Sequence, residues 1–319
     1  MQKVNRILLP QAKKYFLSAF LFIGLAVFFY LTVKNNTWEM AIELGWGLFL
    51  ILISIAIFCI MENILASQIL LRGMGYNVSF TKLYLILTTS LVANYSAPTK
   101  IGVPVRIFLY KKILGIPFPV CTANVSLEIC IGIGTGGLIS LIGIIHLFDD
   151  ILLNNWILLF CFFIPVILFF GVKFFVKSLS LTSQFFQRIF HFFNVFNDSI
   201  KKVSKTALLI FIVLLVIRLV IRCMITYTVL QRFRYNISPL DIFYVQSISG
   251  LISIISMVPM GLGAKDLSLV ALLVRVGVPI EAGTLVAAVE RVMWTIVPFL
   301  LGLFSVYRLN VHWPVERGE

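Results

Sequence analysis

Residues 98–128 read PTKIGVPVRIFLYKKILGIPFPVCTANVSLE, and residues 259–290 read PMGLGAKDLSLVALLVRVGVPIEAGTLVAAVE. Both stretches begin with Pro-x-x-x-Gly and continue through Gly-x-Pro to a glutamate eleven residues after that second proline. Proline and glycine placed this closely interrupt a helix. Broken helices that occur twice in an apolar chain are typical of transporters whose binding site lies between two repeats.

The rest of the chain has the composition of a membrane protein. Of its 319 residues, 60% are hydrophobic and only 12% are charged, which excludes an ordinary soluble domain. Several apolar runs reach the roughly 20 helical residues that cross a hydrocarbon core. Because helices satisfy their own backbone hydrogen bonds in lipid, we expect an all-α polytopic membrane protein, with residues 1–319 forming a single integral domain.

Six apolar runs predict transmembrane helices, at about 15–33, 43–66, 119–145, 154–172, 206–230 and 283–307. Two further regions, 80–114 and 239–276, each consist of two apolar arms joined at Pro-x-x-x-Gly. Their second arms are too short to cross the membrane. We expect each region to form a re-entrant helical hairpin surrounded by protein, because broken backbone cannot face lipid. The alternative is six plain spans plus two pairs of arms that cross fully.

The basic residues indicate an orientation. With two re-entrant hairpins, eighteen of the 26 lysines and arginines fall in cytoplasmic segments, five in external segments and three within spans. This agrees with the positive-inside bias and places both termini in the cytoplasm. Repeat one, at about 43–145, and repeat two, at about 206–307, then have inverted topology. The net charge of +13 is explained by basic loops near anionic head groups, and no nucleic-acid partner is expected.

Residues 183–202, SQFFQRIFHFFNVFNDSIKK, predict an amphipathic cytoplasmic helix. Phenylalanines form one face, and polar and basic residues form the other. We expect this helix to rest on the cytoplasmic leaflet. A surface that recruits a protein partner is the alternative.

Charged residues inside apolar segments are the candidate functional residues, because such charges normally face a bundle interior or a wet cavity. A helix that restarts inside the membrane offers free N–H groups to an anion, so each hinge predicts a cradle for a phosphate-bearing head group. The predicted hinge residues are Pro98, Gly102, Pro259, Gly261 and Gly263. The predicted head-group ligands are Lys100, Arg106, Arg218, Arg222, Lys265 and Arg291. The candidate coupling acids are Glu128, Asp266 and Glu290.

Purely structural roles are the alternative for these residues. Each hinge could be a simple helix break with interfacial basic residues beside it. Arg218 and Arg222 lie one turn apart, and an acid such as Glu128 or Glu290 could neutralise them in place of a lipid phosphate. Glu62 is expected to snorkel toward the cytoplasmic end of its span.

Enzyme motifs are scarce. The sequence contains no HExxH and no P-loop, and its Gly-x-Gly-x-x-Gly at 132–137 lies within a predicted span, where it indicates close helix packing. We therefore expect no catalytic residues, no metal and no cofactor.

Two segments, Ser79–Arg106 and Val258–Arg291, resemble the signature regions of the lysylphosphatidylglycerol synthase/flippase-like transmembrane family. The residues that match its hinges are Pro98, Gly102, Arg106, Pro259, Gly261, Leu262, Gly263 and Asp266. Glu128 and Arg291 match charged residues of its later spans. Val103, Ile129 and Met260 replace a glutamate, an arginine and a glycine of the pattern.

The resemblance covers about residues 15–309 and implies a lipid flippase of a bacterial or archaeal cell membrane. The implied cargo is an anionic, aminoacylated or glycosylated lipid, either a phospholipid or a polyprenyl-phosphate-linked lipid. The synthase activity of the family resides in a separate soluble domain, and we expect this chain to carry only the flippase-like domain.

Two other functions remain open. The protein could be a membrane-embedded enzyme, or an accessory subunit of one, in a lipid-linked glycan or lipid-modification pathway. It could also be a scaffold that recruits a partner through 183–202. Membrane lipids, anionic ones above all, are the expected partners, with a glycosyltransferase or a lipid-modifying enzyme as the candidate protein partner.

Overall fold

The computed structural model describes residues 37–96, 101–148, 194–256, 261 and 263–309. Every regular element in that part of the chain is a helix, which confirms the all-α class. After α2 (Thr37–Glu43), the first set of helices consists of α3 (Trp46–Gly73), α4 (Phe80–Ser96), α5 (Gly102–Leu114) and α6 (Phe118–Leu147). The second set consists of α10 (Lys205–Arg232), α11 (Pro239–Ile255), α12 (Ala264–Arg275), α13 (Ile280–Arg291), the π-helix η2 (Val292–Ile296) and α14 (Val297–Leu309).

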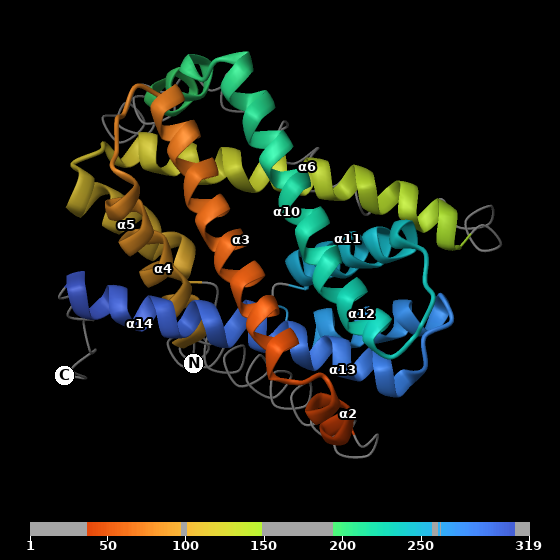
Figure 1. Cartoon of the computed structure of the whole chain (residues 1–319). Coiled ribbons are helices and arrows are strands. Elements are labelled where there is room, and N and C mark those ends of the chain that lie inside the picture. Colours follow the sequence, from red (N-terminus) through yellow and green to blue (C-terminus); the bar gives the residue numbers. More distant parts are fainter. Residues whose placement is uncertain (1–36, 97–100, 149–193, 257–260, 262, 310–319) are drawn as a thin grey trace, which may run out of the picture.

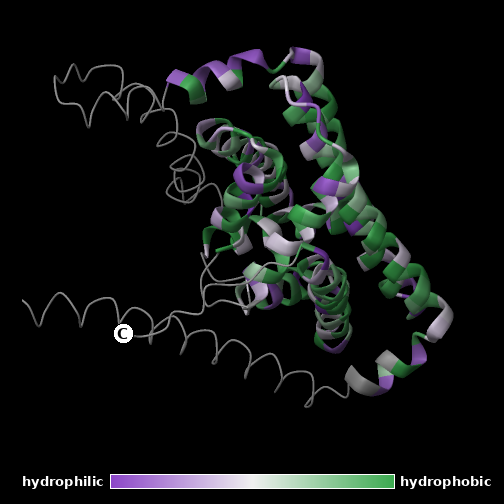
Figure 2. Ribbon diagram, turned by 90° about the vertical axis from the view of Figure 1, so that its left-hand side faces the viewer, coloured by the Kyte–Doolittle hydropathy of each residue, from purple (hydrophilic) through white to green (hydrophobic). Residues whose placement is uncertain are grey.

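Four helices of the described part are long and apolar enough to cross a membrane: α3, α6, α10 and the continuous run from α13 to α14. Hydrophobic residues colour most of the length of these helices (Figure 2). They correspond to four of the six predicted spans. The other two, at 15–33 and 154–172, lie outside the described residues, so the full count of spans stays a prediction.

The first of these spans is longer than the sequence indicated. The prediction ended at residue 66, where polar residues begin, but α3 continues to Gly73. The polar side chains of the extension are satisfied inside the protein. Gln68 Nε2 donates to the carbonyl of Val78 at 2.7 Å, and the Ser67 hydroxyl lies 2.9 Å from that of Tyr110. Because these groups have protein partners, the helix does not need to end at the apolar boundary.

The two regions predicted to be hinged are each divided into two helices. In each region the two arms pack against one another, so the chain reverses direction between α4 and α5 and between α11 and α12. The second arms have 13 and 12 residues, well below the roughly 20 that cross a bilayer. Gly115 and Gly277 end these arms with φ of 67° and 92°, which favours glycine, and Pro117 and Pro279 then precede the next helices.

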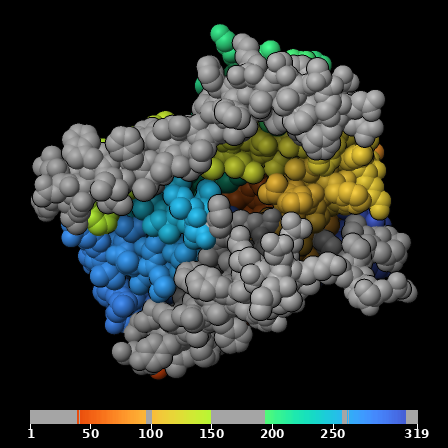
Figure 3. All heavy atoms as spheres, turned by 180° about the vertical axis from the view of Figure 1, so that it is seen from behind, coloured from red at the N-terminus to blue at the C-terminus, as the bar shows by residue number. Residues whose placement is uncertain are grey.

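The two sets of helices exchange packing partners. The first hairpin arm of each set lies along the long last helix of the other set, so α4 packs on α14 and α11 packs on α6. Helices α3 and α10 lie side by side, and α6 and α13–α14 run in opposite directions (Figure 1). From behind, α5 (yellow) and α13 (blue) occupy opposite sides of the molecule (Figure 3). This reciprocal packing is the arrangement expected of inverted repeats.

Hydrophobic side chains form two buried clusters, one mostly within each set of helices. Helices α3 and α10 contribute to both clusters and so connect the two sets. Of the predicted amphipathic segment, residues 194–202 are described, and they are helical. Val195, Phe196 and Ile200 pack against the cluster of the first set. The apolar face of this part is therefore turned toward protein, whereas the prediction had it resting on lipid.

The contact between α4 and α14 and the contact between α6 and α11 are built in the same way. Each contains one pair of hydroxyl groups and one closely packed glycine. Thr88 donates to Ser305 at 2.7 Å where α4 meets α14, and Ser140 and Ser247 lie 3.0 Å apart where α6 meets α11. Gly302 lies against Thr88 and Val92, and Gly143 lies against Tyr244. Small residues allow helix backbones to approach closely in membranes.

Gly302→Ala is expected to lower the free energy of unfolding by about 1–3 kcal/mol, because the added methyl group would overlap with Val92 and the backbone of Thr88. Unfolding in mixed detergent micelles measures the change. Gly134→Ala is the matched control, since outside the adjacent backbone of its own helix no heavy atom of the described structure lies within 4 Å of the added carbon. Equal losses for the two variants would show that the α4–α14 crossing is not tightly packed.

Candidate functional site

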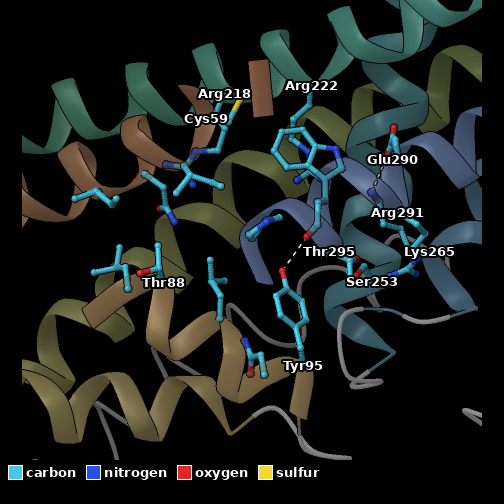
Figure 4. A pocket seen from close by; sticks show the side chains of 18 of the residues that line it. Cys59, Thr88, Tyr95, Arg218, Arg222, Ser253, Lys265, Glu290, Arg291 and Thr295 are labelled. Carbon is cyan, nitrogen blue, oxygen red and sulfur yellow. Dashed lines mark hydrogen bonds and ion pairs between the residues drawn. The ribbon is translucent and has the colours of Figure 1, made fainter. Parts of the chain in front are cut away.

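A cavity of about 360 Å³ lies between the two sets of helices, beside both hinges. Its walls come from α3 and α4 of the first set and from α10 to α14 of the second (Figure 4). Its polar and charged lining residues are Asn63, Thr88, Asn94, Tyr95, Arg218, Arg222, Ser253, Lys265, Asp266, Glu290, Arg291 and Thr295. Four of the six predicted head-group ligands and two of the three candidate coupling acids are thus brought together. Lys100, Pro98 and Pro259 lie outside the described residues.

Arg106 is not among the residues that line this cavity. Its Nη2 donates to Glu128 Oε1 at 2.6 Å and to the Ser67 hydroxyl at 2.7 Å, and its Nε donates to the Tyr110 hydroxyl at 2.9 Å. Both side chains of the ion pair are nearly buried. Arg106 and Glu128 therefore form a closed network inside the first set, between α5, α6 and α3.

The second set of helices holds an ion pair at the corresponding position, between its second hairpin arm and the helix that follows. Glu290 Oε2 accepts from Lys265 Nζ at 2.5 Å, and its Oε1 accepts from the Thr226 hydroxyl at 3.0 Å and from Gln246 Nε2. Lys265 is 9% exposed and Glu290 is 2% exposed. In both sets, the glutamate that follows the Gly-x-Pro turn by eleven residues is paired with the cation of its own hairpin. The repeated spacing was the sequence signal for this pairing.

A second pair of charges lies beside the first. Arg291 donates from Nε and Nη2 to the two carboxylate oxygens of Asp266, and also from Nη2 to the carbonyl of Gly261 at 3.1 Å. Such a two-pronged contact fixes the orientation of the guanidinium. Asp266 also accepts from the backbone N–H of Gly263 at 3.0 Å.

The hinge amides already have acceptors from within the chain. The N–H of Gly102 donates to Asn94 Oδ1 at 2.8 Å, as that of Gly263 does to Asp266. Gly261 and Gly263 have φ of 62° and 77°, a backbone conformation that glycine adopts without strain. Hinge N–H groups that were predicted to bind an anion therefore already donate to acceptors of the protein. The donors without a partner at the cavity belong to side chains.

Glu62 is buried, and both nitrogens Nε and Nη2 of Arg218 donate to its carboxylate. The expectation that Glu62 snorkels is therefore wrong, because the packing of α3 on α10 places it opposite Arg218. The alternative that an acid neutralises Arg218 is confirmed, but the acid is Glu62 and not Glu128 or Glu290. No spacing in the sequence links positions 62 and 218, since the pair depends on how two distant helices cross.

Arg222 is the cation of the cavity that has no carboxylate partner among the described residues. Its guanidinium lies 4.7 Å from the centroid of the Trp294 ring, a cation–π contact, and its buried Nε has no hydrogen-bond partner in that part of the structure. The other three cations of the cavity are each neutralised by one acid. Among the described residues, Arg222 is therefore the cation of the cavity that forms no ion pair.

The sequence limits the acids that could pair with Arg222, and it adds one further cation, Lys100, at the first hinge. The chain has thirteen acidic residues, of which nine lie in the described part. The other four are Asp149, Asp150, Glu316 and Glu319. None of the hinge residues outside the described part, at 97–100, 257–260 and 262, is acidic.

Two more buried donors of the cavity lack partners within the described residues, Trp294 Nε1 and Thr295 Oγ1. Both belong to η2, and π turns occur frequently at functional sites. From the opposite wall, the Tyr95 hydroxyl donates to the carbonyl of Trp294 at 2.8 Å (Figure 4). Sequence reasoning missed Trp294 and Thr295, because no motif marked the π turn that places them in the wall of the cavity.

The described residues contain no group of three or more histidine, cysteine or acidic side chains that could hold a metal ion. The four cysteines among them, Cys59, Cys121, Cys130 and Cys223, are free thiols.

Residues 15–302 match the family described as "Lysylphosphatidylglycerol synthase TM region". The match includes both hairpins and every residue that lines the cavity. A search of curated proteins found no match. The family description and the four apolar helices indicate an integral membrane protein with a lipid-related function. Since the match covers most of its length, the chain belongs to the lysylphosphatidylglycerol synthase transmembrane region family.

Proposed function

We propose that this protein is a lipid flippase, which moves a lipid with an anionic, aminoacylated or glycosylated head group between the leaflets of a cell membrane. The observation that carries the proposal is the uncompensated charge of Arg222 in a cavity between the two sets of helices. Buried donors without partners are rare in native interiors, and three of them belong to residues that line this cavity. A phosphate supplies both the negative charge and the acceptors that they lack.

The position of the cavity supports transport. It lies beside both helix breaks, where transporters with inverted repeats bind their substrates. Three contacts join the sets of helices around it: Glu62 to Arg218, Tyr95 to Trp294 and Thr88 to Ser305. Rocking of one set against the other would break and remake such contacts while the head group stays bound. The proposed orientation has both termini in the cytoplasm and the two hairpins entering from opposite sides.

The enzyme alternative has less support. A general acid or base must be available to a substrate, but the acids of this cavity are held by cations. A lipid-modifying enzyme or a glycosyltransferase acting before the flippase would supply the lipid.

Arg222→Gln is expected to slow transfer of fluorescent phosphatidylglycerol in proteoliposomes by about tenfold to a hundredfold, since hydrogen bonds to a charged group contribute about 1.5–3 kcal/mol. Arg308→Gln is the matched control. Arg308 also lies over an aromatic ring, that of Phe304 at 6.0 Å, but it is exposed and does not line the cavity. Wild-type transfer by Arg222→Gln, in protein that unfolds at the wild-type temperature, would exclude the cavity as the route.

A further inference from the structure

We infer that the hairpin arms α4 and α11 slide together by one helical turn along the long helices of the opposite set when the protein changes state. This inference rests on the proposed function and names the motion that would turn the cavity from one leaflet to the other. It follows from a difference between two equivalent contacts, α4 on α14 and α11 on α6.

The two arms correspond residue by residue. Tyr-Asn-x-Ser directly precedes both of them, at residues 76–79 and 235–238, and each arm has 17 residues. Thr88 and Ser247 are therefore equivalent, since each is the ninth residue of its arm. Both side chains are buried, so their contacts report where each arm lies along its long helix.

The two long helices correspond as well. Helix α6 and the continuous run from α13 to α14 each have 30 residues. Counted from the first of these, position 23 is Ser140 in α6 and Gly302 in α14, and position 26 is Gly143 and Ser305. Both helices thus carry small residues at these two positions, with serine and glycine interchanged.

The arm α4 lies near position 26 of its long helix. The Thr88 hydroxyl lies 2.7 Å from that of Ser305, at position 26. A methyl group added to Gly302, at position 23, would overlap with the backbone of Thr88 and with Val92, four residues further along the arm. Thr88 therefore lies between positions 23 and 26.

The arm α11 lies nearer the start of its long helix. The Ser247 hydroxyl lies 3.0 Å from that of Ser140, at position 23, and donates at 3.0 Å to the carbonyl of Gly136, at position 19. Gly143, at position 26, lies against Tyr244, three residues before Ser247. The two arms are therefore offset by about one turn of 3.6 residues, or roughly 5.4 Å.

Exchanging the two offsets gives a second state. Because the repeats are equivalent, a state in which each arm adopts the register of the other uses contacts of the same kind. Helix α11 then moves toward the end of α6, and α4 moves toward the start of the run from α13 to α14. Since these long helices run in opposite directions, both arms move the same way (Figure 1). One-turn steps between interlocked registers are an established mode of switching in proteins.

The helices are suited to this step. Both arms would pass over positions 23 and 26, which hold only serine and glycine. The hydroxyl pairs can separate at little cost, because their members also have acceptors on their own helices. Thr88 Oγ1 lies 2.6 Å from the carbonyl of Tyr84, and Ser140 donates at 2.7 Å to that of Gly136. These acceptors move with the hydroxyls, so Thr88 and Ser140 keep a partner throughout the step.

The step moves part of the wall of the cavity. Asn94 and Tyr95 near the end of α4, and Ser253 near the end of α11, line the cavity and would travel with the arms. The Tyr95 hydroxyl would leave the carbonyl of Trp294, to which it donates at 2.8 Å (Figure 4). Ile254 occupies the equivalent place in α11 and cannot form such a bond, so the Tyr95 bond favours the register described here. The arms are thus the moving parts of the rocking motion, and the long helices are its frame.

Reversible disulfides test which parts move. Ser140→Cys with Ser247→Cys joins α6 to α11, and Thr88→Cys with Ser305→Cys joins α4 to α14. In both pairs the hydroxyl oxygens lie within 3.0 Å, close enough for the sulfur atoms that replace them to bond. We expect oxidation of either pair, confirmed by mass spectrometry, to slow transfer of fluorescent phosphatidylglycerol in proteoliposomes at least tenfold, and a reductant to restore it. Oxidised wild-type protein, with its native cysteines, should keep its normal rate.

Gly73→Cys with Ala207→Cys is the matched control. It joins α3 to α10, and a β-carbon added to Gly73 would lie 3.5 Å from that of Ala207, within the range found in disulfides. This bond also connects the two sets of helices, but it lies within the frame. We therefore expect the oxidised control to transfer lipid at the wild-type rate.

The outcomes separate the inference from the proposed function. Wild-type transfer by protein with oxidised arms would show that the arms stay in register. An equal loss in the α3–α10 variant would show that whole sets rock against each other. Either result would overturn the one-turn step while the flippase proposal stood. If neither wild-type protein nor the reduced variants moved lipid faster than protein-free vesicles, the proposed function itself would fail.

Discussion

Glu290→Gln is expected to lower the free energy of unfolding by about 3–5 kcal/mol, the loss typical of removing one partner from a buried ion pair. The loss arises from the buried groups that would be left without their carboxylate partner. Lys265 is 9% exposed, and without Glu290 it would be a buried ammonium with no opposite charge. Gln246 and Thr226, which both donate to Glu290, would also lose their carboxylate acceptor. Titration with sodium dodecyl sulfate in mixed micelles measures the change.

Two further variants show whether the effect arises from burial of charge. Adding Lys265→Met to Glu290→Gln should restore most of the lost stability, since the double variant leaves no buried charge of this pair uncompensated. Asp198→Asn removes one partner of an exposed pair, Lys201–Asp198 at 4.0 Å, and should change stability by less than about 1 kcal/mol. If Glu290→Gln were as mild as Asp198→Asn, the buried pair would not support the second set of helices.

The features that could be predicted from the sequence are those that depend on neighbours along the chain. An apolar run forms a helix wherever it lies, and proline and glycine interrupt it wherever they lie, so the described spans and both hairpins appear close to their predicted positions. Glu128 and Glu290 were predicted as charged residues of a candidate site, but their partners were not. The structure pairs them with Arg106 and Lys265 of their own hairpins.

Features that depend on how distant helices cross could not be predicted in this way. Glu62 meets Arg218 because α3 packs on α10, and their separation in the sequence says nothing about that crossing. The same difficulty concealed the role of Arg222. Its neighbour Arg218 has the same residue type and lies one turn away, but only Arg218 forms an ion pair with an acid. The candidate site was therefore predicted as a group of six equivalent cations, and the structure separates one of them from the rest.

That separation suggests a division of tasks inside the cavity. The paired cations brace the hairpins and connect the two sets of helices, because each is fixed by an acid on another element. Arg222 rests on Trp294 and keeps its charge for a ligand. Releasing a second cation from its acid should then change what the cavity accepts as well as how stable the fold is. The pair between Glu62 and Arg218 allows this to be tested, since Arg218 lines the cavity and Glu62 does not.

Glu62→Gln is expected to have two opposite effects. The free energy of unfolding should fall by about 3 kcal/mol, the low end of the range for broken buried pairs, because Arg218 is partly exposed to the cavity. Transfer of a lipid with two negative charges, phosphatidic acid, should rise relative to phosphatidylglycerol, because the cavity then carries two uncompensated cations. The ratio of the two transfer rates in proteoliposomes measures the second effect, and denaturation in mixed micelles measures the first.

Glu128→Gln provides the matched comparison, because it breaks the equivalent pair with Arg106 at a site that does not line the cavity. It should destabilise the protein by a similar amount and leave the ratio of phosphatidic acid to phosphatidylglycerol transfer unchanged. A general loosening of the bundle would alter that ratio equally in both variants. Only a cavity that recognises the lipid by charge would shift its preference in Glu62→Gln alone.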